Sequence, residues 1–211
     1  MTLIEAVLFI SVAIGLIVGG IVFYQQASRA ALWKDISQTL TAIDNEIGRI
    51  YYGAKGDMGI PSNQNYNFTP VLISSGSIPS HMLYDNNVNS VRLGGNRADI
   101  RFLNISGTDV ALYELYNVPA WLCNRLIRTD NRAVGILKRR VRTVALRTGG
   151  KVNGGTGTTY NHWPIYSWIN PPVRTSTGPI TPSVASSLCD TVAEASSNGL
   201  IGLSMQVMHR Y

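Results

Sequence analysis

A single carboxylate, Glu5, stands in the apolar run from Met1 to Tyr24. An ionised side chain within a bilayer costs at least about 2.5–3.5 kcal/mol on insertion scales, so such groups are usually paired. The positively charged α-amino group of Met1 has the complementary charge, and a neighbouring copy of the chain, shifted along the helix axis, would place its amine against Glu5. That pairing would set the stagger between subunits. The alternative is that Glu5 lies near the lipid headgroups and is simply solvated.

Residue patterns typical of catalysis are missing from the sequence. It contains no phosphate-binding G-x-x-x-x-G-K-[ST] motif, no H-E-x-x-H, no G-x-S-x-G and no cysteine pair with zinc spacing. His81, His162 and His209 are scattered along the chain, which favours surface or loop positions. We therefore expect no enzyme activity and no cofactor or metal.

The element that must position Glu5 is a long helix. Met1–Tyr24 holds 24 residues, so as a helix it is about 36 Å long and can cross a hydrocarbon core of about 30 Å. Residues 25–52 continue it as an amphipathic helix that ends before Gly53. Its apolar positions recur in steps of three and four, at Leu32, Ile36, Leu40, Ile43, Ile47 and Ile50. A helix of about 1–52 is far longer than a globular domain needs, which indicates a stalk.

Three glycines, Gly15, Gly19 and Gly20, interrupt the apolar half of this helix. Each costs about 1 kcal/mol relative to alanine in a helix interior. Two interpretations stay open: small residues that let neighbouring transmembrane helices pack closely, or a place where the helix loosens.

The start of the chain shows neither a basic n-region nor a small-residue cleavage site, so we expect an already processed mature form.

Residues 53–211 are expected to form a globular head. Arg101–Ile105, Val110–Tyr116 and Ile201–Met208 have the composition of strands. A helix is predicted near Pro119, with Trp121, Leu122, Cys123 and Leu126 toward a core, and a second over Ser183–Ser197. The segments GIPSNQNYNFTP, LYDNNVNS, RTGGKVNGGTGTTYN and HWPIYSWINPP are predicted as loops or turns.

Both cysteines, Cys123 and Cys189, lie in the head. One disulfide in an oxidising compartment is the favoured interpretation, and two unpaired core thiols are the alternative. A bridge would close a loop of roughly 67 residues and stabilise the fold by about 4 kcal/mol on the chain-entropy model.

Positive charge is concentrated in one part of the head. Between Arg125 and Lys151 the only acid is Asp130, against nine basic residues: Arg125, Arg128, Arg132, Lys138, Arg139, Arg140, Arg142, Arg147 and Lys151. Such a surface attracts DNA, anionic lipid or an acidic partner. A solvated or subunit-contacting face is favoured, because aromatic side chains that would stack on bases are missing from the cluster.

The sequence MTLIEAVLFISVAIGLIVGGIVFYQQAS resembles the mature amino terminus of a type IV pilin, and Met1 in place of phenylalanine points to the type IVb branch, which includes bundle-forming, toxin-coregulated and thin conjugative pilins. The segments IYYGAKG, LISSGSIPSHML, RLGGNRADIRF, AWLCNRL and SSLCDTV are also similar to that branch. The resemblance implies an N-methylated amine at Met1, assembly roles for Thr2 and Glu5, and a disulfide-bounded D-region, 123–189. Val22 stands where many pilins of the other branch have proline.

The fold implied by this resemblance is α+β: a helical stalk and a head built on an antiparallel sheet. Its domains would be a transmembrane and filament-core helix, 1–24, an amphipathic continuation, 25–52, and the head, 53–211. The function implied is that of a major pilin, held in the inner membrane and then polymerised into an extracellular fimbrium that serves adhesion, aggregation, conjugation, or contact with DNA or phage. Prepilin peptidase, the assembly machinery and identical subunits would be its partners. The alternatives are a minor pilin or secretion pseudopilin, and a single-pass anchored binding protein that never polymerises. Outward contacts are expected at Arg125–Lys151 and Gly155–Pro172.

Overall fold

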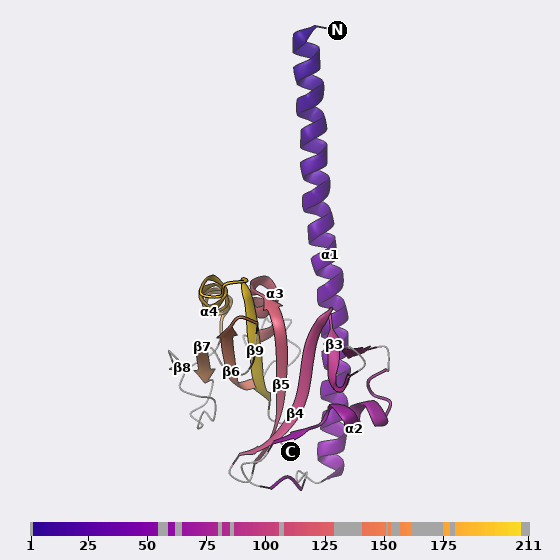
Figure 1. The fold of residues 1–211 in the computed structure, drawn as a ribbon, viewed down its shortest axis with the longest axis vertical. Helices are drawn as coiled ribbons and strands as arrows, with labels where there is room; N and C mark the ends of the chain where they lie inside the picture. Colours follow the sequence, from indigo (N-terminus) through magenta and orange to yellow (C-terminus); the bar gives the residue numbers. More distant parts are fainter. Residues whose placement is uncertain are drawn as a thin grey trace.

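The computed structural model has a long helix that stands on a globular head (Figure 1). It describes residues 2–54, 59–61, 65–79, 82–84, 87–105, 108–128, 141–150, 152, 157–161, 175–177 and 180–207. The expected α+β class, with an N-terminal helical stalk and a head built on a largely antiparallel sheet, is confirmed.

Helix α1 spans Leu3–Gly53 without interruption, 51 residues or about 77 Å. Its C-terminal half lies along the head, as the periodicity predicts. Ile36, Leu40, Ile43 and Ile47 are spaced by four, three and four residues, so they share one face of the helix and are buried against the sheet. The lower half of α1 is therefore part of the core of the head.

The sheet runs in the order β2-β3-β4-β5-β9-β6-β7-β8, with β1 paired to β4 beside this path. Its described strands are β1 (Asn65–Asn67), β2 (Leu83–Tyr84), β3 (Asn87–Leu93), β4 (Asn96–Ile105), β5 (Thr108–Pro119), β6 (Val141–Thr148), β7 (Gly157–Asn161), β8 (Thr175–Thr177) and β9 (Leu200–Val207). Among the described strands, all pairs are antiparallel except β7 with β8. Helix α2 (Thr69–Ser74) packs by β3 and β4, whereas α3 (Ala120–Ile127) and α4 (Pro182–Glu194) pack on each other.

The strand predictions for Arg101–Ile105, Val110–Tyr116 and Ile201–Met208 correspond to β4, β5 and β9, and the predicted helices correspond to α3 and α4. Three of the four loop predictions need correction. GIPSNQNYNFTP contains β1 and the start of α2, LYDNNVNS contains β2 and enters β3, and RTGGKVNGGTGTTYN begins in β6 and contains β7. The fourth, HWPIYSWINPP, lies outside the described residues.

The turn between β3 and β4 brings the sheet close to α1. Gly94 has φ +56° and Gly95 has φ +85°, backbone conformations that residues other than glycine rarely adopt. A Cβ atom at Gly94 would also lie 2.6 Å from the Cδ1 atoms of Ile36 and Leu32. Glycine is therefore needed at position 94 both for the turn and for the close approach of α1.

Candidate assembly surface

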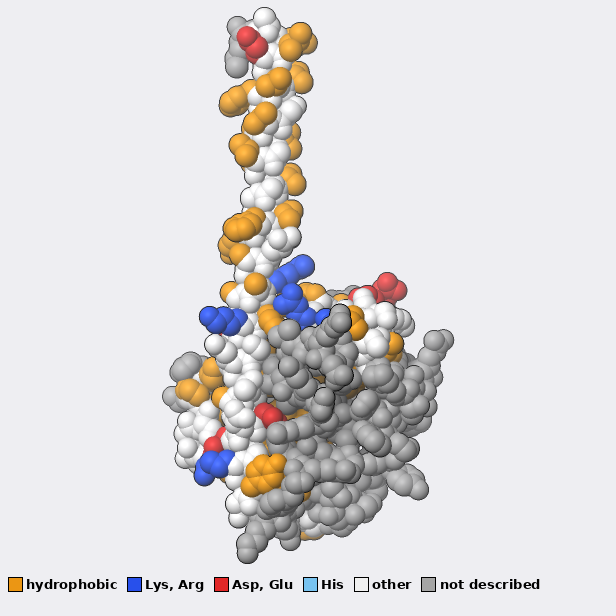
Figure 2. Space-filling model, turned by 180° about the vertical axis from the view of Figure 1, so that it is seen from behind, with side chains coloured by type: hydrophobic (Ala, Val, Ile, Leu, Met, Phe, Trp, Pro, Cys, Tyr) orange, Lys and Arg blue, Asp and Glu red, His pale blue; other side chains and the backbone are white. Residues whose placement is uncertain are grey.

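The N-terminal half of α1 is bare. Large apolar side chains are exposed along it from Leu3 (84%) through Phe9 (68%) to Phe23 and Tyr24 (74% each). The helix is long and apolar enough to cross a membrane, and none of its most apolar 18-residue stretch is buried. Figure 2 shows these side chains on all visible sides of the stalk. Because the whole circumference is apolar, this segment requires a lipid or protein environment.

Glu5 is held at the start of α1 by a capping box with Thr2. The Thr2 backbone N–H donates to Glu5 Oε2 at 2.7 Å, and the Glu5 backbone N–H donates to Thr2 Oγ1 at 3.4 Å. Two backbone donors at the helix end are satisfied in this way, and the carboxylate also has a favourable position at the positive end of the helix dipole. Within one chain, Glu5 therefore already has a local structural role.

The capping box leaves room for a second partner of Glu5. In the described part of the chain Glu5 Oε1 has no hydrogen bond, and the side chain is exposed. An amine from another copy can thus approach the carboxylate without displacing Thr2. Met1 lies outside the described residues, so its pairing with Glu5 stays a prediction. The sequence signal for the box was present as Thr2-x-x-Glu5, the pattern S/T-x-x-E that marks a helix start, and our sequence analysis missed it.

The helix is continuous through Gly15, Gly19 and Gly20. Among the described residues, a Cβ atom at any of these positions would meet no atom of the same chain within 4 Å. The three glycines are therefore not required for contacts within one copy. Close packing between copies and loosening on assembly both stay predictions.

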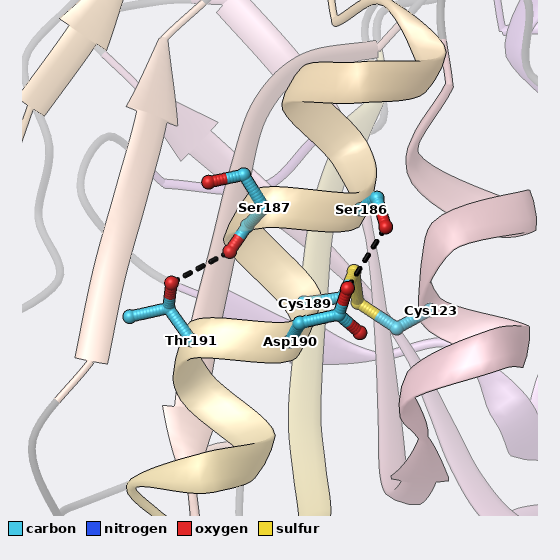
Figure 3. The surroundings of a disulfide bond; sticks show 6 residues. All are labelled: Cys123, Ser186, Ser187, Cys189, Asp190 and Thr191. Carbon is cyan, nitrogen blue, oxygen red and sulfur yellow. Dashed lines mark hydrogen bonds between the residues drawn. A yellow bond between two sulfur atoms is a disulfide. The ribbon is translucent and has the colours of Figure 1, made fainter.

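The disulfide joins the two helices at the upper end of the head. Cys123 of α3 and Cys189 of α4 are bonded, and both are fully buried (Figure 3). Ala185, Cys189 and Val192 share the inner face of α4 through spacings of four and three residues. Its outer side is polar, with Ser186 Oγ donating to Asp190 Oδ2 and Thr191 Oγ1 donating to the Ser187 carbonyl. The expected disulfide is confirmed.

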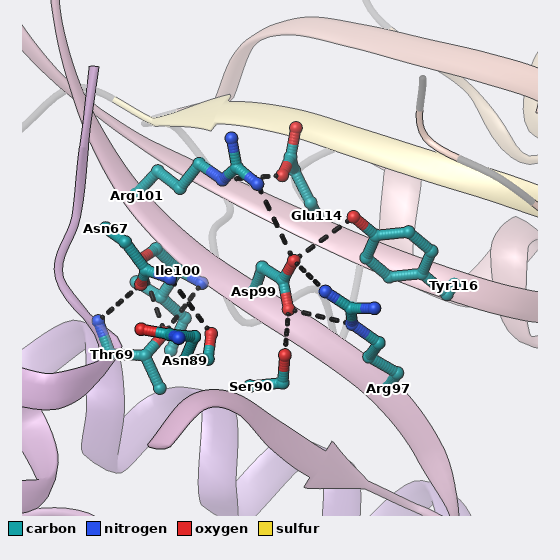
Figure 4. A network of polar contacts seen from close by, with 10 residues as sticks. All are labelled: Asn67, Thr69, Asn89, Ser90, Arg97, Asp99, Ile100, Arg101, Glu114 and Tyr116. Carbon is teal, nitrogen blue, oxygen red and sulfur yellow. Dashed lines mark hydrogen bonds and ion pairs between the residues drawn. The ribbon is translucent and has the colours of Figure 1, made fainter. Parts of the chain in front are cut away.

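A charged network connects β3, β4 and β5 on the sheet face turned away from α1 (Figure 4). Asp99, 1% exposed, is its centre. It accepts hydrogen bonds from the Ser90 hydroxyl at 2.6 Å, from Arg97 Nε and Nη2 at 3.1 and 2.9 Å, and from the Tyr116 hydroxyl at 3.1 Å. Buried charge is tolerated when it is paired and hydrogen-bonded in this way.

Arg101 bridges two acids that face each other in this network. Asp99 and Glu114 are directly opposite on β4 and β5, an arrangement that repels when both are ionised. Arg101 Nε lies 3.0 Å from Glu114 Oε2, and its Nη2 lies 3.7 Å from Asp99 Oδ2. Burial raises the pKa of Glu114, an effect that Arg101 partly opposes, and burial together with Asp99 raises the pKa of Tyr116. The network clamps the strands together, and sequence analysis did not find it because its members are spread over three strands.

Of the predicted basic cluster, the structure describes the side chains of three residues. Arg125 is exposed on α3 and Arg128 is half-buried at its end, whereas the Arg147 side chain is buried within β6. The side chain of Arg142, the residues Arg132, Lys138, Arg139, Arg140 and Lys151, and the three histidines lie outside what the structure describes. Gly155–Pro172 does so too, apart from the backbone of β7.

The predicted core-facing side of α3 is confirmed. Leu122, Cys123 and Leu126 are buried, and Trp121 is partly buried and packs against the same core. The Trp121 ring also lies beside Arg29 of α1, with 5.8 Å from the ring centroid to Arg29 Cζ.

No group of His, Cys, Asp and Glu side chains suited to a metal ion occurs among the described residues. Comparison with protein-family models gives no match, and comparison with curated proteins gives none either.

Proposed function

We propose that the chain is a structural subunit of a type IV pilus filament of the type IVb branch. The observation that carries the proposal is a fully apolar, unburied half-helix attached to a head that is itself well packed. A head that needed only its own core would not require the first half of α1. In this proposal the inner membrane covers that half before assembly, and neighbouring stalks cover it afterwards.

The energetic argument favours many copies packed together. Moving apolar surface from lipid into a helix–helix contact gives little hydrophobic gain. Close packing between stalks and specific polar pairing must therefore drive their association within the membrane. Once the filament leaves the membrane, contact with water would cost about 25 cal/mol per Å² of apolar surface, and only burial among other stalks avoids this cost. Glu5, already oriented by Thr2, supplies the charge that would pair with a neighbouring amine and fix the register.

Surface fibres provide the direct test. Fibres sheared from cells that express the chain should contain it as the dominant protein, and an atomic map of them should show packed α1 helices at the axis. Mass spectrometry of the fibre protein should show a methylated Met1. If the chain is a minor component of the fibres, the major-subunit proposal is wrong and the minor pilin remains. If it occurs only as monomers in the membrane, it is an anchored protein that does not polymerise.

A further inference from the structure

Arginine and tryptophan side chains alternate where the bare stalk meets the head. On α1, Arg29 and Trp33 are four residues apart and thus on one face. On α3, Trp121 and Arg125 have the same spacing in the opposite order. The pairs are crossed: the Arg29 Cζ lies 5.8 Å from the Trp121 ring centroid, and the Arg125 Cζ lies 5.7 Å from that of Trp33. We call these four residues the Arg–Trp collar.

The collar lies at the height expected for lipid headgroups. Arg29 follows Tyr24 by five residues, which is about 7.5 Å along the helix axis. Headgroup regions add roughly 5–7.5 Å to each side of a 30 Å hydrocarbon core. If the apolar half of α1 spans that core, Arg29 is at the outer headgroup boundary, and its contact with Trp121 brings α3 to the same level. In Figure 1, α3 lies at the end of the head that faces the bare stalk.

The charge near the collar is positive on the α1–α3 side. Figure 2 shows Lys and Arg side chains gathered where the stalk enters the head. Exposed Lys34 adds a further positive charge on α1. The acid on this stretch is Asp35, six residues and thus about 9 Å further from the apolar half than Arg29. The exposed acids Asp190 and Glu194 belong to α4.

The arginines retain donors for a ligand. Both are exposed, and neither makes a hydrogen bond or ion pair with the described part of the chain. A guanidinium that contacts an aromatic ring still presents N–H groups, which bind phosphate in a bidentate manner. Tryptophan is enriched at the boundary between lipid and water, where its ring is apolar and its N–H is solvated.

We propose that the Arg–Trp collar binds the phosphates of anionic phospholipids and seats the head on the bilayer while the stalk is in the membrane. The inference rests on the proposed function, since it requires the membrane-held stage of the subunit. It goes beyond that function by giving the head its own lipid contact and by naming the lipid class. Basic residues near a membrane surface each contribute attraction to anionic lipid, and salt screens this attraction.

Spin-labelled lipids test this proposal in the full-length chain. The chain is reconstituted into vesicles of phosphatidylcholine that contain a minority of phosphatidylglycerol, and the motionally restricted fraction of each spin-labelled lipid is measured. We expect phosphatidylglycerol to associate more strongly than phosphatidylcholine, by up to about fivefold for each arginine that contacts a headgroup, with the preference lost at high salt.

Two double variants separate the collar from net charge. Arg29→Gln with Arg125→Gln should remove most of the preference, whereas Arg49→Gln with Arg92→Gln, equal in charge but outside the collar, should retain it. Arg29→Lys with Arg125→Lys keeps the charge at the collar and should retain part of it, which provides a readout if loss of the ring contacts weakens the fold. Equal association of both lipids with the wild-type chain, or an equal loss in both glutamine variants, would overturn the collar alone. Failure of the chain to enter vesicles would overturn the membrane-held stage and the collar together.

Discussion

Tyr113 of β5 donates a hydrogen bond from its hydroxyl to Asp44 Oδ1 of α1 at 3.2 Å, and both side chains are buried. This bond crosses the interface between the stalk helix and the sheet, where the remaining contacts are mostly apolar. A shift of α1 along its axis would separate these two buried groups and break the bond. The bond therefore favours the observed register of α1 over registers shifted along the axis.

Removal of this hydroxyl should weaken the head. Tyr113→Phe should lower the free energy of unfolding by about 1–3 kcal/mol, since buried Asp44 loses a hydrogen-bond donor while packing is retained. Urea unfolding in detergent micelles, followed by circular dichroism, measures the change. Tyr66→Phe is the matched control, because Tyr66 is 52% exposed. Equal stability of wild type and Tyr113→Phe would show that the bond contributes nothing net.

The charge of Glu5 and its capping role can be separated by substitution. Glutamine serves in a capping box as glutamate does, so Glu5→Gln should leave the start of α1 helical while it removes the charge that would pair with an amine. If charge pairing sets the register, Glu5→Gln should reduce the yield of sheared filaments as severely as Glu5→Ala.

Thr2→Ser is the companion control, because serine keeps the cap and should assemble. Filament yield at the wild-type level in Glu5→Gln would refute charge pairing and leave the carboxylate as a helix cap only.

The buried acid Glu114 should give stability a specific pH dependence. Burial raises its pKa in the folded state, so its contribution to stability is complete below the unfolded pKa of about 4.3 and is lost as pH rises through the folded value. Glu114→Gln does not titrate. The free energy of unfolding of the wild type, minus that of Glu114→Gln, should therefore fall as pH rises from about 4.

Glu46→Gln provides a comparison of opposite sign. The hydrogen bond from Arg49 lowers the pKa of Glu46, so the stability that Glu46 contributes is present above its unfolded pKa and lost as pH falls. The effect should be small because Arg49 is 71% exposed. For Glu114, the buried-acid interpretation is wrong if the free energy of unfolding of the wild type, minus that of Glu114→Gln, rises with pH.

The bond between Cys123 and Cys189 should be a major source of stability. Replacement of both by alanine should lower the free energy of unfolding by about 4 kcal/mol, because the unfolded chain regains the freedom of a long loop. Reduction of the wild-type protein should give a similar loss in urea unfolding. If neither change shifts the midpoint, α3 and α4 are held by packing alone.

The turn between β3 and β4 provides a matched pair of glycine substitutions. Gly95→Ala introduces backbone strain only, since its Cβ would meet open space, and should cost about 1–2 kcal/mol. Gly94→Ala adds a clash with Ile36 and Leu32 to the same strain and should cost more. Thermal unfolding of the two variants compares them directly. Equal losses would mean that α1 yields at this contact without cost.

Much of the fold is predictable from local patterns in the sequence. The apolar residues that recur along α1 fix both its helical state and its buried face, and residue composition predicts strands such as β5. The short and polar strands escape prediction because Asn65, Asn67 and Asn87 carry weak strand propensity, and pairing with neighbouring strands decides their conformation. Helical periodicity predicts that Trp121 points toward the core, but it does not reveal that α1 passes beside it with an arginine.

The candidate site shows the same division between local and distant information. The apolar stalk and Glu5 are visible in the sequence because both depend on neighbouring residues. The Asp99 network and the Arg–Trp collar combine residues that are far apart in the chain, and they emerge only when the sheet and helices are placed in space.

The burial of Ile36, Leu40, Ile43 and Ile47 gives the head a mechanical consequence. A tensile load on α1 acts along the length of its seam with the sheet, so apolar contacts resist in parallel and must slide together before any one of them parts. Under such a load, the contacts between α1 and the sheet would therefore not separate one at a time. In the proposed filament, a load would thus pass from each α1 helix into its own sheet. The disulfide joins α3 to α4 and does not join α1 to the sheet, so it would carry little of this load.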